Sequence, residues 1–140
     1  MNPEKTIAID YGLSRVGLAI SDAMGIFAKP YSTLAFQGDH ELAEDIKTII
    51  RDENIDVVVI GNPVHFSGDD SEISIKVRNF AAILEDITDA RIVVFDERLT
   101  SKRAKQIMHS KGEKPSKNKN RLNAIAAAVI LNNYLTKKAD

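Results

Sequence analysis

The chain contains no cysteine in its 140 residues. This absence excludes a disulfide scaffold, a cysteine-based zinc site and a cysteine nucleophile. No apolar run approaches the length of a membrane-spanning helix, and the first residues lack the basic-then-apolar pattern of a secretory signal. We therefore expect a cytoplasmic protein with no membrane partner.

Three common sequence motifs are also missing. The chain has no Walker phosphate loop, no Gly-x-Gly-x-x-Gly dinucleotide loop and no Gly-x-Ser-x-Gly nucleophile turn. Its three histidines lie in unrelated segments and form no pair four residues apart. Serine hydrolase chemistry therefore has no support, and the carboxylates become the candidates for catalysis.

Charge is distributed unevenly along the chain. The whole sequence has 19 Lys and Arg against 20 Asp and Glu, a net charge of −1. Residues 102–121, which we call the basic strip, contain one acid and eight basic residues and carry +7, so the remainder carries −8. Such a strip is typical of a surface that binds nucleic acid, although solvated lysines also serve solubility alone. The basic residues are Lys102, Arg103, Lys105, Lys111, Lys114, Lys117, Lys119 and Arg121.

The hydrophobic pattern predicts five strands. Segments 6–10, 16–22 and 29–36 are joined by short turns, which favours an antiparallel meander. Segments 56–61 and 91–95 are continuous apolar runs rich in β-branched residues, which is typical of strands buried on both faces.

Helices are predicted between and after the later strands. Apolar residues at helical spacing place them over 39–52, over about 73–84, after Thr100 or Ser101, and over 121–137. Asp39 and one of Thr100 or Ser101 are the expected N-caps, and 111–120 reads as a flexible loop. The element order predicts one α/β domain over residues 1–140, with a mixed sheet and helices on both faces.

Acidic residues follow the first and last predicted strands. Asp10 ends the first strand and Asp96-Glu97 ends the last, whereas the fourth strand ends at Gly61-Asn62. Ligands of open α/β sheets gather at the carboxyl ends of the strands, so these side chains are expected to converge. Carboxylates suit Mg²⁺ or Mn²⁺, and two such ions about 4 Å apart can clamp a scissile phosphate and activate water.

Simpler interpretations of these acids stay open. Asp10 can merely open a turn, and Asp96 and Glu97 can pair with Arg98 or cap the following helix. Consecutive residues of a strand point to opposite faces, so only one of Asp96 and Glu97 should face a site. Because the strand is expected to end at these residues, the alternation of side chains along a strand does not show whether Asp96 or Glu97 faces the site.

Four groups of residues occur in an order and spacing that match a known family. They are Asp10-Tyr11-Gly12 with Arg15 and Gly17; Gly61-Asn62-Pro63 with Gly68; Asp96-Glu97-Arg98-Leu99-Thr100; and Asn123 with Ala126-Ala127 and Ile130-Leu131. In this arrangement the chain resembles the YqgF/RuvX family of RuvC-like proteins with a ribonuclease H-like fold. The resemblance covers almost the whole chain and is most specific in the Asp-Glu-Arg-Leu-Thr segment.

The resemblance implies a five-stranded mixed sheet in the order 3-2-1-4-5, flanked by helices. It implies a nuclease that uses Mg²⁺ or Mn²⁺, either for 5′-end maturation of pre-16S rRNA in ribosome biogenesis or as a Holliday junction resolvase in DNA recombination. The expected partners are pre-rRNA or branched DNA and the ribosome, with a monomer or a homodimer as the assembly. A nucleotide-binding fragment of the actin/Hsp70 fold would share the turn after Asp10, but one 140-residue domain lacks the second lobe that encloses ATP.

Position by position, the resemblance implies that Asp10 is a metal ligand and that Glu97 (or Asp96) is the second catalytic acid. The family usually has Asp just before the Ala-Ala segment of the last helix, where this chain has Asn123. Asn keeps a carbonyl oxygen for the metal but loses the charge, so we expect Asn123 to assist a weaker metal site. The alternative is a nucleic-acid-binding ribosome-assembly factor with weakened catalysis. The expected nucleic-acid-binding residues are Arg15, Arg98, Lys102, Arg103, Lys114, Lys117, Lys119 and Arg121.

Overall fold

The computed structural model describes residues 3–63 and 72–139. Its strands are β1 (Thr6–Asp10), β2 (Arg15–Ser21), β3 (Ala28–Ala35), β4 (Val57–Pro63) and β5 (Arg91–Glu97). Its helices are α1 (Asp39–Glu53), α2 (Glu72–Ile87), α3 (Thr100–Ser110) and α4 (Lys119–Ala139), with a short 3₁₀-helix, η1 (Pro115–Lys117). Gly68, one of the residues that carry the resemblance, lies outside the described ranges.

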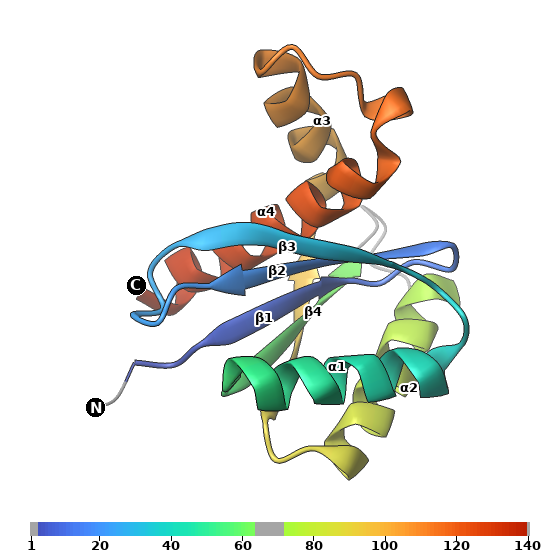
Figure 1. The fold of residues 1–140 in the computed structure, drawn as a ribbon, viewed down its shortest axis with the longest axis vertical. Coiled ribbons are helices and arrows are strands. Elements are labelled where there is room, and N and C mark those ends of the chain that lie inside the picture. The colour runs from blue at the N-terminus through green and yellow to red at the C-terminus, as the bar shows by residue number, and fades with distance from the viewer. Residues whose placement is uncertain (1–2, 64–71, 140) are drawn as a thin grey trace.

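The strands form a mixed sheet in the order β3-β2-β1-β4-β5 (Figure 1). β1, β2 and β3 pair antiparallel, whereas β4 pairs parallel with β1 and β5 pairs parallel with β4. This arrangement confirms the predicted mixed sheet and its predicted order. It also places the carboxyl ends of β1, β4 and β5 at the same edge.

The two faces of the sheet are covered by different helices because strand residues alternate between them. Ile9 belongs to the core formed with α1 and α2, around the fully buried Phe80. Its neighbour Ala8 belongs to the second core, formed with Ala127 and Ile130 of α4. α4 is enclosed nearly all round in its middle, since its residues 124–131 are all buried.

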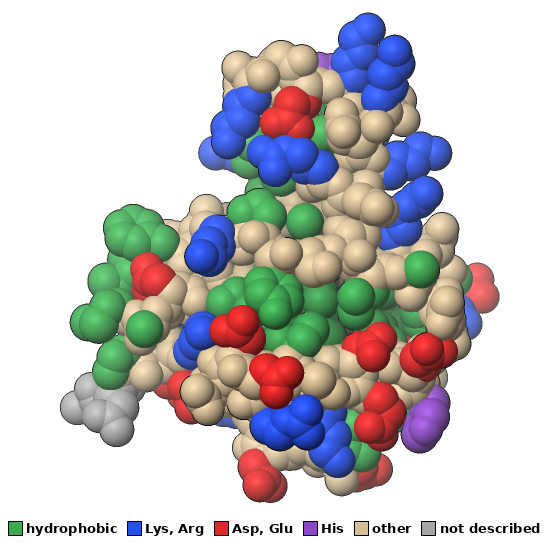
Figure 2. Space-filling model, viewed as in Figure 1, with side chains coloured by type: hydrophobic (Ala, Val, Ile, Leu, Met, Phe, Trp, Pro, Cys, Tyr) green, Lys and Arg blue, Asp and Glu red, His purple; other side chains and the backbone are tan. Residues whose placement is uncertain are grey.

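A lobe stands off the sheet and is formed by residues 100–123, which comprise α3, η1 and the first turn of α4 (Figure 1). Ala104 and Met108 of α3 pack against Ile125 and Ala126 of α4. Figure 2 shows Lys and Arg side chains gathered on this lobe, while acidic side chains on the same view lie mostly over the rest of the molecule. The predicted flexible loop therefore contains η1, and the last helix begins at Lys119 rather than at Arg121.

Two predicted helix caps are wrong. Gly38 is the N-cap of α1, and Asp39 is its first residue, where the carboxylate accepts a hydrogen bond from the Tyr11 hydroxyl at 2.5 Å. Leu99, with a φ of 58°, precedes α3, and neither helix has a side-chain cap. The expected cap is one position too late in α1 and one or two positions too late in α3. The carboxylate of Asp39 bonds to Tyr11 instead, and Thr100 donates its hydroxyl to Glu97.

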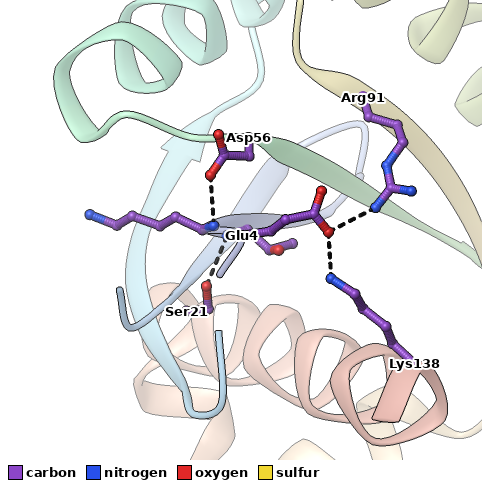
Figure 3. Close-up of polar contacts among 7 residues, drawn as sticks. Glu4, Ser21, Asp56, Arg91 and Lys138 are labelled. Carbon is purple, nitrogen blue, oxygen red and sulfur yellow. Dashed lines mark hydrogen bonds and ion pairs between the residues drawn. The ribbon is translucent and has the colours of Figure 1, made fainter. Parts of the chain in front are cut away.

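Residues near the start of the chain contact the sheet at the edge opposite to the carboxyl ends of β1, β4 and β5 (Figure 3). Oε1 of Glu4 lies 3.1 Å from the guanidinium of Arg91 and 2.5 Å from Nζ of Lys138. The backbone N–H of Thr6 donates to the hydroxyl of Ser21 at 2.8 Å. Glu4, just before β1, is thereby joined to β5 and to the last turn of α4, and Thr6 joins β1 to β2. Within the described ranges, none of the helices combines the length and the apolar character needed to cross a bilayer.

Candidate active site

Asp10 and Glu97 lie on the same face of the sheet, the face covered by α4. Along β1, Ala8 packs against α4, and Asp10 follows two residues later. Along β5, Phe95 packs on the same core, and Glu97 follows two residues later. The period-two alternation of strands therefore brings both carboxylates to the α4 side at the carboxyl ends of their strands.

Gly61 provides the space between the two acids. It lies on β4, the strand between β1 and β5, on the same face. A Cβ at this position would lie 3.6 Å from Cγ of Glu97 and 2.5 Å from Cδ1 of Ile130, so Glu97 passes close over this glycine. Neighbouring strands are about 4.8 Å apart, which means that an acid on β5 has to reach across a strand toward Asp10. The longer Glu side chain is suited to that position.

Asp96 faces the other side of the sheet. Its Oδ1 accepts a hydrogen bond from the amide of Asn62 at 2.7 Å, and Oδ1 of Asn62 accepts one from the Ser74 hydroxyl of α2 at 2.7 Å. β5 continues through Glu97, beyond the predicted end at residue 95. Because side chains alternate along a strand, Asp96 and Glu97 point to opposite faces of the sheet. The structure brings Glu97, and not Asp96, to the face of Asp10.

Burial raises the pKa of both carboxyl groups on the α4 side. Burial raises the pKa of Asp10 to about 7, and the negative charge of Glu97 contributes to the same shift. Burial also raises the pKa of Glu97, against hydrogen bonds from Thr100 that favour its charged form. Two carboxylates that are held together with little hydration attract a cation strongly.

The donor set fits a hard divalent cation. Carboxylate oxygens are the ligands that Mg²⁺ and Mn²⁺ prefer, and Asp10 and Glu97 supply them from two strands. In the part of the chain that the structure describes, no group of three or more His, Cys, Asp and Glu side chains could hold a metal ion. Among the described residues, the site therefore offers two acids where the family pattern suggests three.

Thr100 holds the carboxylate of Glu97. Its side chain is buried at the first position of α3, and its hydroxyl donates to Oε2 of Glu97. Leu99 adopts a left-handed backbone conformation that turns the chain back from β5 into α3. Sequence reasoning assigned Thr100 only a capping role. Its spacing of three from the acid, within the most specific motif of the resemblance, was the signal for this contact.

Asn123 lies over β2, the strand that pairs with β1 beside Asp10. In the register of β1 and β2, Asp10 is opposite Gly17, and a Cβ on Gly17 would lie 1.9 Å from the carbonyl oxygen of Asn123. The helix backbone therefore contacts the strand backbone at this point. The side-chain amide of Asn123 donates to the carbonyl of Lys119 at 2.8 Å, which directs its nitrogen toward the start of α4.

The predicted nucleic-acid-binding residues lie on the lobe and next to the acids. Lys102 and Arg103 are on α3, Lys114 and Lys117 are at η1, and Lys119 and Arg121 are in the first turn of α4. Arg15 begins β2 on the face of Gly17, and Arg98 directly follows Glu97. Arg121 forms an ion pair with Glu113 at 2.5 Å, so part of its charge is already balanced.

Comparison with known proteins decides the family. A family model described as "RuvX: Holliday junction resolvase" matches residues 4–137. The chain belongs to the RuvX family. A relative from Maridesulfovibrio salexigens, named "Putative pre-16S rRNA nuclease", is 38% identical over 133 residues, which cover 95% of this chain and 98% of the relative. A relative of the same name from Dictyoglomus thermophilum is 32% identical over 131 residues, covering 94% of each chain. The resemblance stated from the sequence is confirmed.

Solved structures show the same fold at low sequence identity. RuvC from T. thermophilus, solved in complex with a Holliday junction substrate, matches this RuvX chain with a TM-score of 0.61 and 12% identity, over 97% of this chain and 96% of that one. The yeast mitochondrial Holliday junction resolvase Ydc2 matches with a TM-score of 0.57 and 11% identity, over 99% and 81%. Together with the sheet order, these matches confirm the predicted ribonuclease H-like fold.

Proposed function

We propose that this RuvX-family chain is a metal-dependent endonuclease that hydrolyses phosphodiester bonds in structured nucleic acid, and that its substrate is the 5′ extension of pre-16S rRNA. The observation that carries the proposal is the pairing of Asp10 and Glu97 on one face of the sheet, beside the lobe that bears the basic strip. The names of the relatives favour rRNA as the substrate. The family description favours the second candidate, a resolvase that cuts branched DNA.

Asp10 and Glu97 would hold Mg²⁺ or Mn²⁺, with the amide oxygen of Asn123 as an assisting ligand. The ion supplies charge stabilisation for the phosphate and lowers the pKa of water. Thr100 keeps the Glu97 carboxylate in place, so little side-chain freedom is lost when the site fills. Because a proton competes at Asp10 with a pKa of about 7, binding of the ion should weaken below neutral pH.

The basic lobe attracts the substrate. Its lysines and arginines neutralise phosphates without reading sequence, so affinity should fall steeply with salt. A nucleic-acid-binding assembly factor with weak catalysis is a third candidate. It is favoured by the two-acid site and by the neutral side chain at Asn123.

The test is a cleavage assay with Mg²⁺ or Mn²⁺ on two labelled substrates, a pre-16S rRNA fragment with its 5′ extension and a four-way DNA junction. Wild type is compared with Glu97→Gln and with its neighbour variant Asp96→Asn. We expect cleavage of the RNA by wild type and a loss of about 100-fold or more in Glu97→Gln, because a lost metal ligand removes several kcal/mol of transition-state stabilisation. Asp96→Asn should keep most of the activity, since its side chain faces α2.

Each other outcome assigns a different function. Cleavage of the junction but not the RNA identifies a resolvase, and binding without cleavage of either identifies an assembly factor. Equal activity in wild type and Glu97→Gln, with both folded, contradicts the active site as assigned.

A further inference from the structure

A hollow of about 540 Å³ opens between the lobe and β2. α3, η1, the first turn of α4 and the start of β2 all contribute to its wall. The lining residues are Arg15, Lys105, His109, Pro115, Ser116, Lys119, Leu122 and Asn123. Lys105 and His109 are not among the residues that sequence reasoning selected for binding.

The hollow joins cationic side chains to an apolar surface. Arg15, Lys105 and Lys119 supply three positive charges, and none of the described residues of the lining is acidic. None of the three forms an ion pair with a described residue, in contrast to Arg121, which is paired with Glu113. Their charges are therefore available to an anion. Leu122 and Pro115 supply the apolar part of the wall.

The hollow adjoins the candidate active site. Asn123 lines it and contacts Gly17, the residue paired with Asp10 across β1 and β2. Arg15 lies two residues before Gly17, on the same face of β2. A nucleic-acid strand whose scissile phosphate lies at Asp10 and Glu97 would therefore have a neighbouring nucleotide within reach of the hollow.

The volume and the mixed lining match a nucleotide better than a bare phosphate. Pockets for small organic ligands occupy about 300–1,000 Å³ and combine apolar walls with a few placed polar groups. A phosphate group gains nothing from contact with the apolar side chains of Leu122 and Pro115. A nucleic-acid base, in contrast, stacks on apolar surfaces and on imidazole rings such as that of His109. A base that is stacked and paired in a duplex cannot enter a hollow unless it leaves the stack.

We propose that this hollow binds one unpaired nucleotide of the substrate strand, next to the scissile phosphate. The phosphate of that nucleotide contacts Arg15, Lys105 and Lys119, and its base lies against Leu122 and His109. The proposal rests on the proposed nuclease function and adds a substrate class, namely strands with an unpaired nucleotide beside the cut. The enzyme then selects the boundary between paired and unpaired nucleic acid by shape, without reading sequence.

Binding is tested without catalysis, by titrating the protein in EDTA with AMP, with inorganic phosphate and with adenosine, followed by NMR or calorimetry. We expect AMP to bind more tightly than either fragment. Lys105→Gln should weaken AMP binding about fivefold or more, whereas Lys47→Gln, which removes the same charge from an exposed position on α1 outside the lining, should change it less than about twofold. His109→Ala should weaken AMP binding but not phosphate binding.

The contrary results are equally clear. If phosphate binds as tightly as AMP and His109→Ala changes neither, the hollow is only an anion site and the nucleotide proposal is overturned. Absence of AMP binding by the folded wild type, or equal losses in Lys105→Gln and Lys47→Gln, also overturns it. Thermal denaturation of each variant shows whether it is folded.

A second arm separates this proposal from the nuclease function. Asp10→Asn, which should not cut, should still bind AMP in EDTA as wild type does. Failure of wild type to cut any substrate would remove the nuclease function while leaving AMP binding intact. If wild type cuts, it should prefer a substrate with an unpaired nucleotide beside the cleavage site over one of the same sequence with that nucleotide paired, and Lys105→Gln should reduce this preference. Cleavage with equal rates on both substrates contradicts the proposed substrate class.

Discussion

Burial raises the pKa of Asp10 to about 7, and the charge of Glu97, which lies on β5 two places away in the sheet, adds to that shift. A carboxyl group with such a pKa is unfavourably placed in the folded protein whenever it is ionised. A bound cation would remove this penalty, because its positive charge stabilises the ionised carboxylate. The relationship between these two residues therefore links stability, pH and metal binding.

Asp10→Asn should stabilise the metal-free protein at pH 8. The folded pKa of Asp10 lies above the unfolded value near 3.8, so the folded state binds more protons between about pH 4 and pH 7 and stability falls as pH rises through that window. A shift of about three pKa units corresponds to roughly 4 kcal/mol, and we expect roughly 2–4 kcal/mol from urea denaturation in EDTA. The gain should vanish well below pH 3.8, where the carboxyl group is protonated in both states.

Adding Mn²⁺ to wild type and to Asp10→Asn provides the matching control. Mn²⁺ should raise the unfolding midpoint of wild type, because an ion that binds only the folded state stabilises it, and should have little effect on Asp10→Asn. An Asp10→Asn protein that is no more stable at pH 8, or that gains as much from Mn²⁺ as wild type, would contradict the electrostatic account of the site.

Thr100→Val should weaken metal binding while keeping the fold. Valine has nearly the same shape but cannot donate to Glu97, so the carboxylate loses the hydrogen bond that holds it. Loss of such a supporting contact typically lowers metal affinity about 10- to 100-fold. The measurement is the Mn²⁺ dissociation constant, with Thr100→Ser as the rescue variant because it retains the hydroxyl. Equal affinities in the valine and serine variants would show that the hydroxyl has no part in holding Glu97.

Glu4→Gln should lower stability modestly at neutral pH. Glu4 contacts Lys138 and Arg91, and its hydrogen bond to Lys138 lowers its pKa below 4.5. Its contribution is therefore present at neutral pH and is lost as pH falls through the folded pKa. Exposed ion pairs contribute about 0.2–1 kcal/mol and weaken in salt, so the loss should stay within that range and shrink in 1 M NaCl. The control is Glu85→Gln, which changes an exposed acid on α2. An equal loss of stability in this variant would show that the ion pairs of Glu4 with Arg91 and Lys138 make no specific contribution.

Much of the fold was accessible from the sequence because its periodicity is strong. The β-branched runs at 56–61 and 91–95 correspond to β4 and β5, and the first three strands were correct to within one residue at most ends. The order of the sheet came from the resemblance and not from periodicity, since hydrophobic patterns say which segments are strands but not which strands pair. The helix caps failed because a hydroxyl or carboxylate with a tertiary partner, such as Asp39 with Tyr11, is not available to its own helix.

The sequence was sufficient to predict which acidic residues belong to the candidate site, but not how their side chains are arranged. The choice between Asp96 and Glu97 depended on whether β5 continued through both residues, and strand ends are poorly encoded in local sequence. The resemblance selected Asn123, but the hydrogen bond from its amide to the Lys119 carbonyl depends on a side-chain rotamer that local sequence does not specify. The hollow was not predictable because it requires residues of β2, α3, η1 and α4 to be brought together by tertiary packing.

Gly17→Ala should destabilise the protein far more than Gly61→Ala. A Cβ on Gly17 would lie 1.9 Å from the Asn123 carbonyl oxygen, a backbone atom that can move only if α4 moves. A Cβ on Gly61 meets Cδ1 of Ile130 at 2.5 Å, and that side-chain end can rotate away. Overpacking of a core typically costs about 1–3 kcal/mol, which we expect for Gly61→Ala, with more than about 3 kcal/mol for Gly17→Ala in urea denaturation. Similar losses in the two variants would show that α4 is not in backbone contact with β2.

Asn123→Asp should strengthen metal binding and increase cleavage. The new carboxylate cannot donate to the Lys119 carbonyl, so it loses the contact that now directs the Asn123 amide toward the start of α4. A third negative oxygen donor beside Asp10 and Glu97 would balance more of the charge of a divalent ion, and we expect Mn²⁺ affinity to rise about tenfold, equivalent to about 1.4 kcal/mol.

The matched control for that substitution is Asn120→Asp, which adds the same charge three residues earlier on α4. Because Asn120 is exposed and its backbone carbonyl accepts a hydrogen bond from Thr33, this residue is held away from the acids, and Mn²⁺ affinity should not change. Equal gains in both variants would mean that added charge anywhere on the lobe improves metal binding. No gain in Asn123→Asp would mean that position 123 does not reach the metal, so that Asp10 and Glu97 act as a two-acid site whose remaining ligands come from solvent and substrate.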